Sequence, residues 1–122
     1  MSSKVLIVDD EPNILMSLEF LLKKSGYKVF IARDGREALD IVEKELPDII
    51  LLDVMMPEVD GYEVCQKIKN DKETAHIKIV FLSAKTKQED IDKGYELGAD
   101  LYITKPFSTR NLITKVDSLK TP

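Results

Sequence analysis

Short apolar runs of strand length recur along the chain and alternate with longer segments whose apolar residues recur at helical spacing. The runs are nearly all apolar and rich in β-branched residues, which is typical of strands buried on both faces of a parallel sheet. They cover residues 4–8, 27–31, 49–52, 77–82 and 101–103. The pattern therefore predicts five strands.

The segments between the runs begin with residues that favour helix starts. Pro12 suits the first turn of a helix, and capping-box spacing begins at Asp34, Asp60 and Thr86. Ser108 is expected to cap a last helix in a similar way. Alternating strands and helices with short connections predict an α/β fold, a doubly wound (βα)5 sandwich with helices on both faces of a parallel sheet. A flavodoxin-like sheet of this size has the strand order 2-1-3-4-5.

The fourth helical segment, near residues 87–97, has the weakest apolar face. Ile91 and Tyr95 form only a narrow stripe. Gly94 lies in the interior of the segment, where glycine costs about 1 kcal/mol relative to alanine. Because few buried contacts predict low local stability, we expect this helix to be the most mobile part of the fold.

Length and composition favour one soluble domain, spanning residues 1–122. The chain has 122 residues, of which 43% are hydrophobic and 33% charged. A net charge of −4 argues against sequence-blind binding to nucleic acid and against electrostatic binding to a membrane. The single cysteine, Cys65, excludes an internal disulfide, and no apolar run approaches the roughly 20 residues of a membrane span. A cytoplasmic location is the simplest interpretation.

Chemically active side chains stand where the predicted strands end. Asp9 and Asp10 follow the first run, Asp53 follows the third, Ser83 the fourth, and Lys105 closely follows the fifth. The carboxyl ends of parallel strands meet at one edge of a sheet, so these side chains are expected to converge. Any one aspartate could be no more than a helix N-cap, but that explanation does not account for the whole set.

Three converging carboxylates repel one another by about 4 kcal/mol per pair at about 4 Å and near-surface dielectric. A hard divalent cation would neutralise them, and the oxygen-only ligand set suits Mg²⁺, with Mn²⁺ or Ca²⁺ as alternatives. The metal, the Lys105 ammonium and the Ser83 hydroxyl could each bind one oxygen of a phosphoryl group. Asp53, alone on the predicted central strand, is the expected nucleophile and would form an acyl phosphate.

Two other functional classes fit the sequence less well. An aspartate-nucleophile phosphatase typically needs a second aspartate two residues after the nucleophile, where Met55 stands. A flavin phosphate would be repelled by Asp9, Asp10 and Glu11, and the sequence has no G-x-G-x-x-G motif for a dinucleotide. A signalling module controlled by phosphorylation is therefore the leading hypothesis.

The same residues carry a resemblance to a known family, over essentially the whole chain. They are Val8-Asp9-Asp10-Glu11, Leu52-Asp53-Val54-Met55-Met56-Pro57, Asp60-Gly61, Leu82-Ser83-Ala84, Gly98-Ala99-Asp100 and Lys105-Pro106-Phe107. In this combination the sequence resembles the receiver domain of bacterial two-component response regulators, and the chemotaxis regulators among them. The resemblance implies a domain that is no enzyme beyond its own phosphorylation and dephosphorylation.

The resemblance implies a role for each matching residue at the acidic edge. Asp53 would accept a phosphoryl group from a partner histidine kinase. Asp10, Asp53 and the backbone carbonyl of Met55 would bind Mg²⁺ directly, and Asp9 would hold the ion through water.

The resemblance also implies a switch. Ser83 would hydrogen-bond the phosphoryl group and move on activation, Lys105 would pair with the same group, and Tyr102 would swing inward once Ser83 has moved. The peptide bond before Pro106 is expected to be cis. The face around the fourth helix, fifth strand and fifth helix would then control an output domain or a partner protein. The alternative is a degenerate receiver that binds partners without being phosphorylated.

Overall fold

Five parallel strands form one sheet with the order β2-β1-β3-β4-β5, as the sequence predicts. The computed structural model describes residues 3–56 and 60–119, so Pro57, which is part of the resemblance, lies outside the described residues. The strands are β1 (Lys4–Val8), β2 (Lys28–Ala32), β3 (Ile49–Asp53), β4 (Lys78–Ser83) and β5 (Leu101–Thr104). The helices are α1 (Pro12–Lys24), α2 (Gly35–Glu45), α3 (Gly61–Asn70), α4 (Gln88–Glu96) and α5 (Thr109–Asp117).

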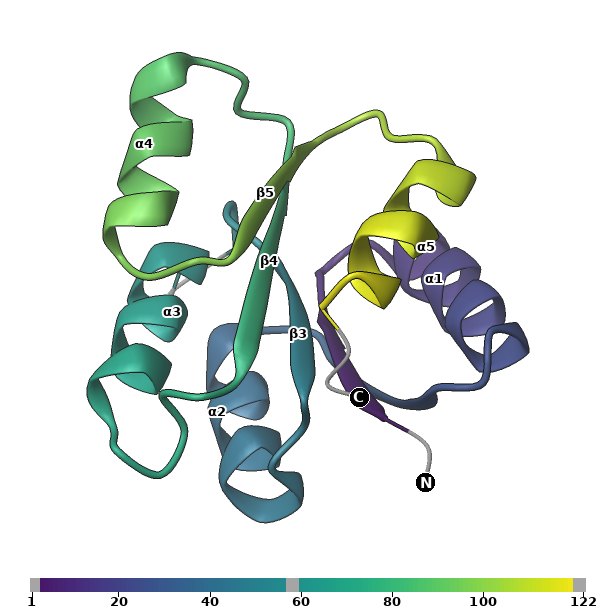
Figure 1. Ribbon diagram of the computed structural model, residues 1–122, viewed down its shortest axis with the longest axis horizontal. Coiled ribbons are helices and arrows are strands. Elements are labelled where there is room, and N and C mark those ends of the chain that lie inside the picture. The colour runs from purple at the N-terminus through teal and green to yellow at the C-terminus, as the bar shows by residue number, and fades with distance from the viewer. Residues whose placement is uncertain (1–2, 57–59, 120–122) are drawn as a thin grey trace.

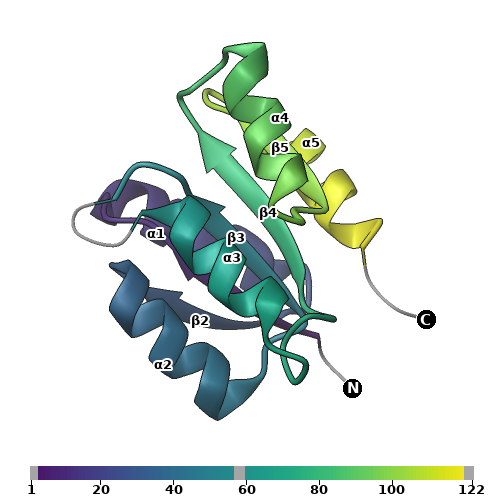
Figure 2. The same ribbon diagram turned by 90° about the vertical axis from the view of Figure 1, so that its left-hand side faces the viewer.

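Helices cover both faces of the sheet, with α1 and α5 on one face (Figure 1). The helices α2, α3 and α4 cover the other face, along which they lie in this order (Figure 2). Ile50 and Leu52 of β3 pack with α2 and α3, whereas Ile49 and Leu51 pack with α1 and α5, because successive strand residues point to opposite faces. Burial on both faces explains why β3 is apolar at every position before Asp53.

Most of the predicted helix starts are confirmed. The side chains of Asp34 and Asp60 accept hydrogen bonds from backbone amides three residues later, at 2.8 and 2.9 Å, and Ser108 does the same at 3.2 Å. The predicted cap at Thr86 is wrong, because α4 begins one residue later and its N-cap, Lys87, makes no capping hydrogen bond with its side chain. Across residues 3–56 and 60–119, no helix is both long and apolar enough to cross a membrane.

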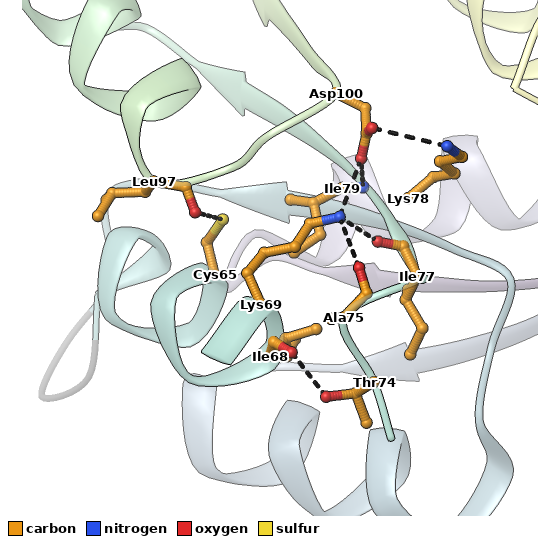
Figure 3. Close-up of polar contacts among 10 residues, drawn as sticks. All are labelled: Cys65, Ile68, Lys69, Thr74, Ala75, Ile77, Lys78, Ile79, Leu97 and Asp100. Carbon is orange, nitrogen blue, oxygen red and sulfur yellow. Dashed lines mark hydrogen bonds and ion pairs between the residues drawn. The ribbon is translucent and has the colours of Figure 1, made fainter. Parts of the chain in front are cut away.

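A lysine holds the amino ends of β4 and β5 together. The Nζ of Lys69, on α3, donates to the carbonyl oxygens of Ala75 at 3.2 Å and Ile77 at 2.7 Å. It also pairs with Asp100 Oδ2 at 3.3 Å, and that oxygen accepts a hydrogen bond from the amide of Ile79 at 2.9 Å (Figure 3). The side chain thus ties α3 and the α3–β4 loop to the starts of two strands, at the edge opposite the predicted site.

Replacement of Lys69 by methionine should lower the free energy of unfolding by about 1–3 kcal/mol, because part-buried carbonyl oxygens and Asp100 lose a charged donor. Urea unfolding at neutral pH measures the change. Lys67→Met is the matched control, since Lys67 lies on the same helix and forms an exposed pair with Glu63, at 3.9 Å. The control should change stability by less than about 0.5 kcal/mol, and equal losses in both variants would contradict the role of Lys69.

Candidate functional site

The side chains expected at the strand ends do meet at one edge of the sheet. Asp9 directly follows β1, Asp53 ends β3 and Ser83 ends β4, and β1 and β4 are the two neighbours of β3. Lys105 directly follows β5, the neighbour of β4. Parallel strands all run towards this edge, so residues far apart in the sequence lie within one site.

Lys105 forms the electrostatic centre of this edge. Its Nζ lies 3.1 Å from Asp9 Oδ2 and 3.9 Å from Asp53 Oδ1. Asp9 is 1% exposed and Asp53 is 5% exposed, so both carboxylates are largely removed from water. One ammonium group therefore faces two buried negative charges, and its closer partner is Asp9.

Backbone amides fix the orientation of both buried carboxylates. Asp9 Oδ1 accepts a hydrogen bond from the amide of Glu11 at 2.9 Å. Asp53 Oδ1 accepts one from the amide of Met55 at 3.2 Å. Each carboxylate is thus held by the chain that follows its own strand, which leaves less freedom for the side chain to turn away from the edge.

The acidic cluster fits a hard divalent cation. One carboxylate oxygen from each of Asp9, Asp10 and Asp53 lies within 4.8 Å of the others. Asp10 is exposed, so the cluster is open on one side. Three carboxylates carry more negative charge than Lys105 offsets, and an oxygen-only donor set suits Mg²⁺. The contact between the metal and the Met55 carbonyl stays a prediction.

The pKa of Asp53 is raised to about 6. Burial is the largest cause, and the negative charge of the neighbouring Asp9 is the second. The positive charge of Lys105 and the hydrogen bond from the Met55 amide lower the pKa but do not cancel the rise. At neutral pH most of the population therefore still carries Asp53 as a carboxylate, the form that nucleophilic attack requires.

Gly61 allows α3 to begin directly against the end of β3. A Cβ atom at Gly61 would lie 2.2 Å from the carbonyl oxygen of Asp53 and 2.9 Å from the Cα of Val54. The amide of Gly61 also donates to the carbonyl of Val54 at 3.0 Å. A side chain at this position would displace the backbone of Asp53 itself, so Gly61 helps to set the position of the carboxylate.

Ser83 is fully buried, and its contacts run towards β5 and the following loop. Its Oγ accepts a hydrogen bond from the amide of Lys85 at 3.0 Å, and its carbonyl accepts one from the amide of Lys105 at 2.7 Å. Among residues 3–56 and 60–119, no hydrogen bond joins Ser83 to Asp9 or Asp53. The site residues therefore share one edge, but the serine hydroxyl is engaged with its own loop.

Tyr102 already lies inward, with 9% of its surface exposed, and its hydroxyl donates to the carbonyl of Lys85 at 3.0 Å. The peptide bond between Lys105 and Pro106 is cis, as the resemblance implies. Lys85 links Ser83 and Tyr102 through its backbone amide and carbonyl. A residue that acts through its amide and carbonyl leaves no residue-type signal, so the sequence could not identify this link.

Residues 5–117 match the family described as the response regulator receiver domain. The chain belongs to this family.

Solved structures have the same fold as this receiver domain. The chemotaxis protein CheY4 of Vibrio cholerae aligns with a TM-score of 0.93 and 32% identity, over 98% of this chain and 100% of that one. A receiver domain of a signal transduction histidine kinase from Syntrophus aciditrophicus gives a TM-score of 0.90 and 35% identity, over 97% and 89%. A CheY-like receiver domain protein from Methanospirillum hungatei gives 0.90 and 31%, over 97% and 93%.

Membership of the family defines the general role of the domain. Receiver domains are signalling domains and not classical enzymes, and those of two-component systems work with histidine kinases and output domains. The converged aspartates, serine and lysine of this chain are the residues on which the resemblance rests.

Asp53→Asn should make the receiver domain more stable at about pH 7.5, by about 1–3 kcal/mol. The pKa of Asp53 in the folded protein, about 6, lies above the ordinary value of 3.8, so the folded state binds the proton more tightly than the unfolded state does. The stabilising contribution of Asp53 is therefore complete below pH 3.8 and is lost as the pH rises through about 6.

Thermal and urea unfolding in buffer with a chelator, between about pH 4 and pH 8, measure this effect. The gain in stability of Asp53→Asn over the wild type should shrink towards the acid end of the range. Asp40→Asn, at an exposed position on α2, is the control and should show no such trend. A gain that is equal at every pH would contradict the assigned cause.

Proposed function

We propose that this receiver domain accepts a phosphoryl group on Asp53 from a histidine kinase, with Mg²⁺ bound at the acidic cluster, and thereby controls an output domain or partner protein. The observation that supports this proposal is the arrangement around Asp53. A largely buried carboxylate at the end of the central strand lies 3.9 Å from the Lys105 ammonium and within 4.8 Å of two further carboxylates. The reaction belongs to the cytoplasm, where kinase and receiver meet.

The nucleophile is one oxygen of Asp53. Its Oδ1 accepts the Met55 amide and is the oxygen nearer to Lys105, whereas its Oδ2 accepts no hydrogen bond from the described residues. We therefore assign attack to Oδ2. A bond forms between this oxygen and phosphorus as the bond from phosphorus to the histidine nitrogen of the kinase breaks, and the histidine leaves with the electron pair.

The other residues stabilise the charge of the transferred group. Asp9, Asp10, Asp53 and the Met55 carbonyl are the ligands that would hold Mg²⁺, with Asp9 acting through water. The ion, when bound, supplies positive charge to the phosphoryl oxygens. Lys105 leaves its ion pair with Asp9 and forms one with the incoming phosphoryl group. The new ion pair is strong because the site is largely buried and water screens it little.

The switch follows from the charge that phosphorylation adds, roughly −1.5 to −2. The new acceptor oxygens attract the Ser83 hydroxyl, which must leave the Lys85 amide to reach them. The loop after β4 then changes its contacts, and with it the face of α4, β5 and α5. The complete set of reactive residues favours this function over a degenerate receiver that only binds partners.

Intact-mass spectrometry after incubation with acetyl phosphate tests the proposal. The wild type should gain one phosphoryl group in Mg²⁺ and none in a chelator, and Asp53→Asn should gain none, because it lacks the nucleophile. Lys105→Met should slow the reaction by about 100-fold, the effect typical of losing one charge-stabilising donor.

Asp40→Asn, which keeps the acidic edge intact, is the matched control and should react as the wild type does. No adduct on the wild type, or an adduct that persists in Asp53→Asn, would overturn the proposal in favour of a receiver that only binds partners.

A further inference from the structure

Helix α4 is held to the fold by few apolar contacts. Of its residues, 88–96, only Gly94 is buried. A Cβ atom at Gly94 would lie 3.0 Å from Tyr102 Cδ2 and 3.1 Å from Phe81 Cδ2. The inward ring of Tyr102 therefore occupies the space that a side chain at this position would need. Glycine weakens the interior of a helix relative to alanine, so this close approach of the ring lowers the intrinsic stability of α4.

The next residue, Tyr95, contacts Tyr102 through the backbone. Tyr95 is 45% exposed, yet its hydroxyl accepts a hydrogen bond from the amide of Tyr102 at 3.1 Å. β5 is an edge strand, and the amide of Lys105 bonds to the carbonyl of Ser83 on β4. Because alternate residues of a strand bond to the same neighbour, the amide of Tyr102 faces the free edge. The Tyr95 hydroxyl is therefore the hydrogen-bond acceptor for this amide, in the place of a carbonyl from a further strand.

Two consecutive residues of α4 thus engage two different parts of Tyr102. Gly94 makes room for the ring, and Tyr95 binds the amide. The hydroxyl of Tyr102 then donates to the carbonyl of Lys85, and the amide of Lys85 donates to Ser83 Oγ. A continuous chain of contacts therefore runs from the exposed Tyr95 to the hydroxyl at the acidic edge.

We propose that Gly94 and Tyr95 are positioning residues that hold Tyr102 inward before phosphorylation and thereby favour phosphorylation of Asp53. The second part rests on the proposed function and on the role that the resemblance implies for Tyr102, which is inward once Ser83 has moved to the phosphoryl group. Coupling between two sites is reciprocal, so a contact that stabilises the inward state also favours the modification that selects it. Loss of either contact reduces the fraction of molecules that are ready to react.

The orientation of Tyr102 can be measured without phosphorylation. We would label the four tyrosines with 3-fluorotyrosine and assign the Tyr102 fluorine signal by its loss in Tyr102→Phe. In the wild type this signal should be protected from a soluble paramagnetic reagent. Gly94→Ala, which places a methyl group against the ring, and Tyr95→Phe, which removes the acceptor of the amide, should each expose it.

Tyr27→Phe is the matched control for the loss of a tyrosine hydroxyl. Tyr27 donates to Asp117 Oδ1 at 2.5 Å, at the end of α5 and outside the contacts of α4. This variant should leave the Tyr102 signal protected. A Tyr102 that is exposed in the wild type, or that stays protected in both α4 variants, would overturn the proposal.

Reaction with acetyl phosphate in Mg²⁺ tests the coupling to Asp53. Tyr95→Phe should slow phosphorylation by about 2- to 10-fold, the equivalent of one net hydrogen bond, and Gly94→Ala should slow it in the same direction. In a Tyr102→Ala background neither substitution should have an effect, because both act through Tyr102.

The results separate this proposal from the proposed function. Effects that persist undiminished in the Tyr102→Ala background would show that α4 acts by another route, and the coupling would be refuted. If the wild type itself gained no phosphoryl group, the proposed function would fail, while the fluorine signals would still decide whether Gly94 and Tyr95 hold Tyr102 inward.

Discussion

The carboxylates of Asp9 and Asp53 lie nearly buried at one edge of the sheet, with the ammonium group of Lys105 as their shared counter-charge. Burial of a charge is costly unless the charge is paired, and here two negative charges share one positive partner. The protein tolerates this arrangement because backbone amides of Glu11 and Met55 also bind the two carboxylates. Burial, together with the remaining excess of negative charge, accounts for the raised pKa of Asp53. The excess negative charge also accounts for the fit of a divalent cation.

The same charge imbalance makes the edge responsive. An arrangement in which every charge was fully paired would gain little from a new ligand. In the proposed function this edge would gain from a divalent cation and would rearrange when a phosphoryl group is added. The elements closest to that change are the loop after β4 and the strand β5. Single hydrogen bonds join the loop to both strands, from the Lys85 amide to Ser83 Oγ and from the Tyr102 hydroxyl to the Lys85 carbonyl. Such contacts exchange at low cost, in contrast to the apolar layers on β1 and β3.

Helix α4 illustrates what local sequence patterns predict and what they do not. Its narrow apolar stripe and internal glycine predicted weak packing, and Gly94 is indeed its single buried residue. The mobility of the helix stays a prediction. The predicted start at Thr86 was wrong by one residue, because an N-cap depends on backbone geometry that the capping-box pattern does not define. The sequence could not show why position 94 is glycine. The reason is the close approach of the rings of Phe81 and Tyr102, which belong to β4 and β5.

The sequence by itself determined the order of strands and helices, the two-sided burial of the sheet and the convergence of Asp9, Asp10, Asp53, Ser83 and Lys105 on one edge. These features follow from periodicity and from the rule that parallel strands end at the same edge, and both act over short segments of chain. Only the tertiary structure decided which partner each group takes: Lys105 lies closer to Asp9 than to Asp53, and Tyr95 binds the free amide of β5. It also decided that Lys69 binds the chain at the start of β4 and that Gly61 packs against the backbone at the end of β3. Such choices depend on distances between residues remote in sequence, which no local pattern encodes.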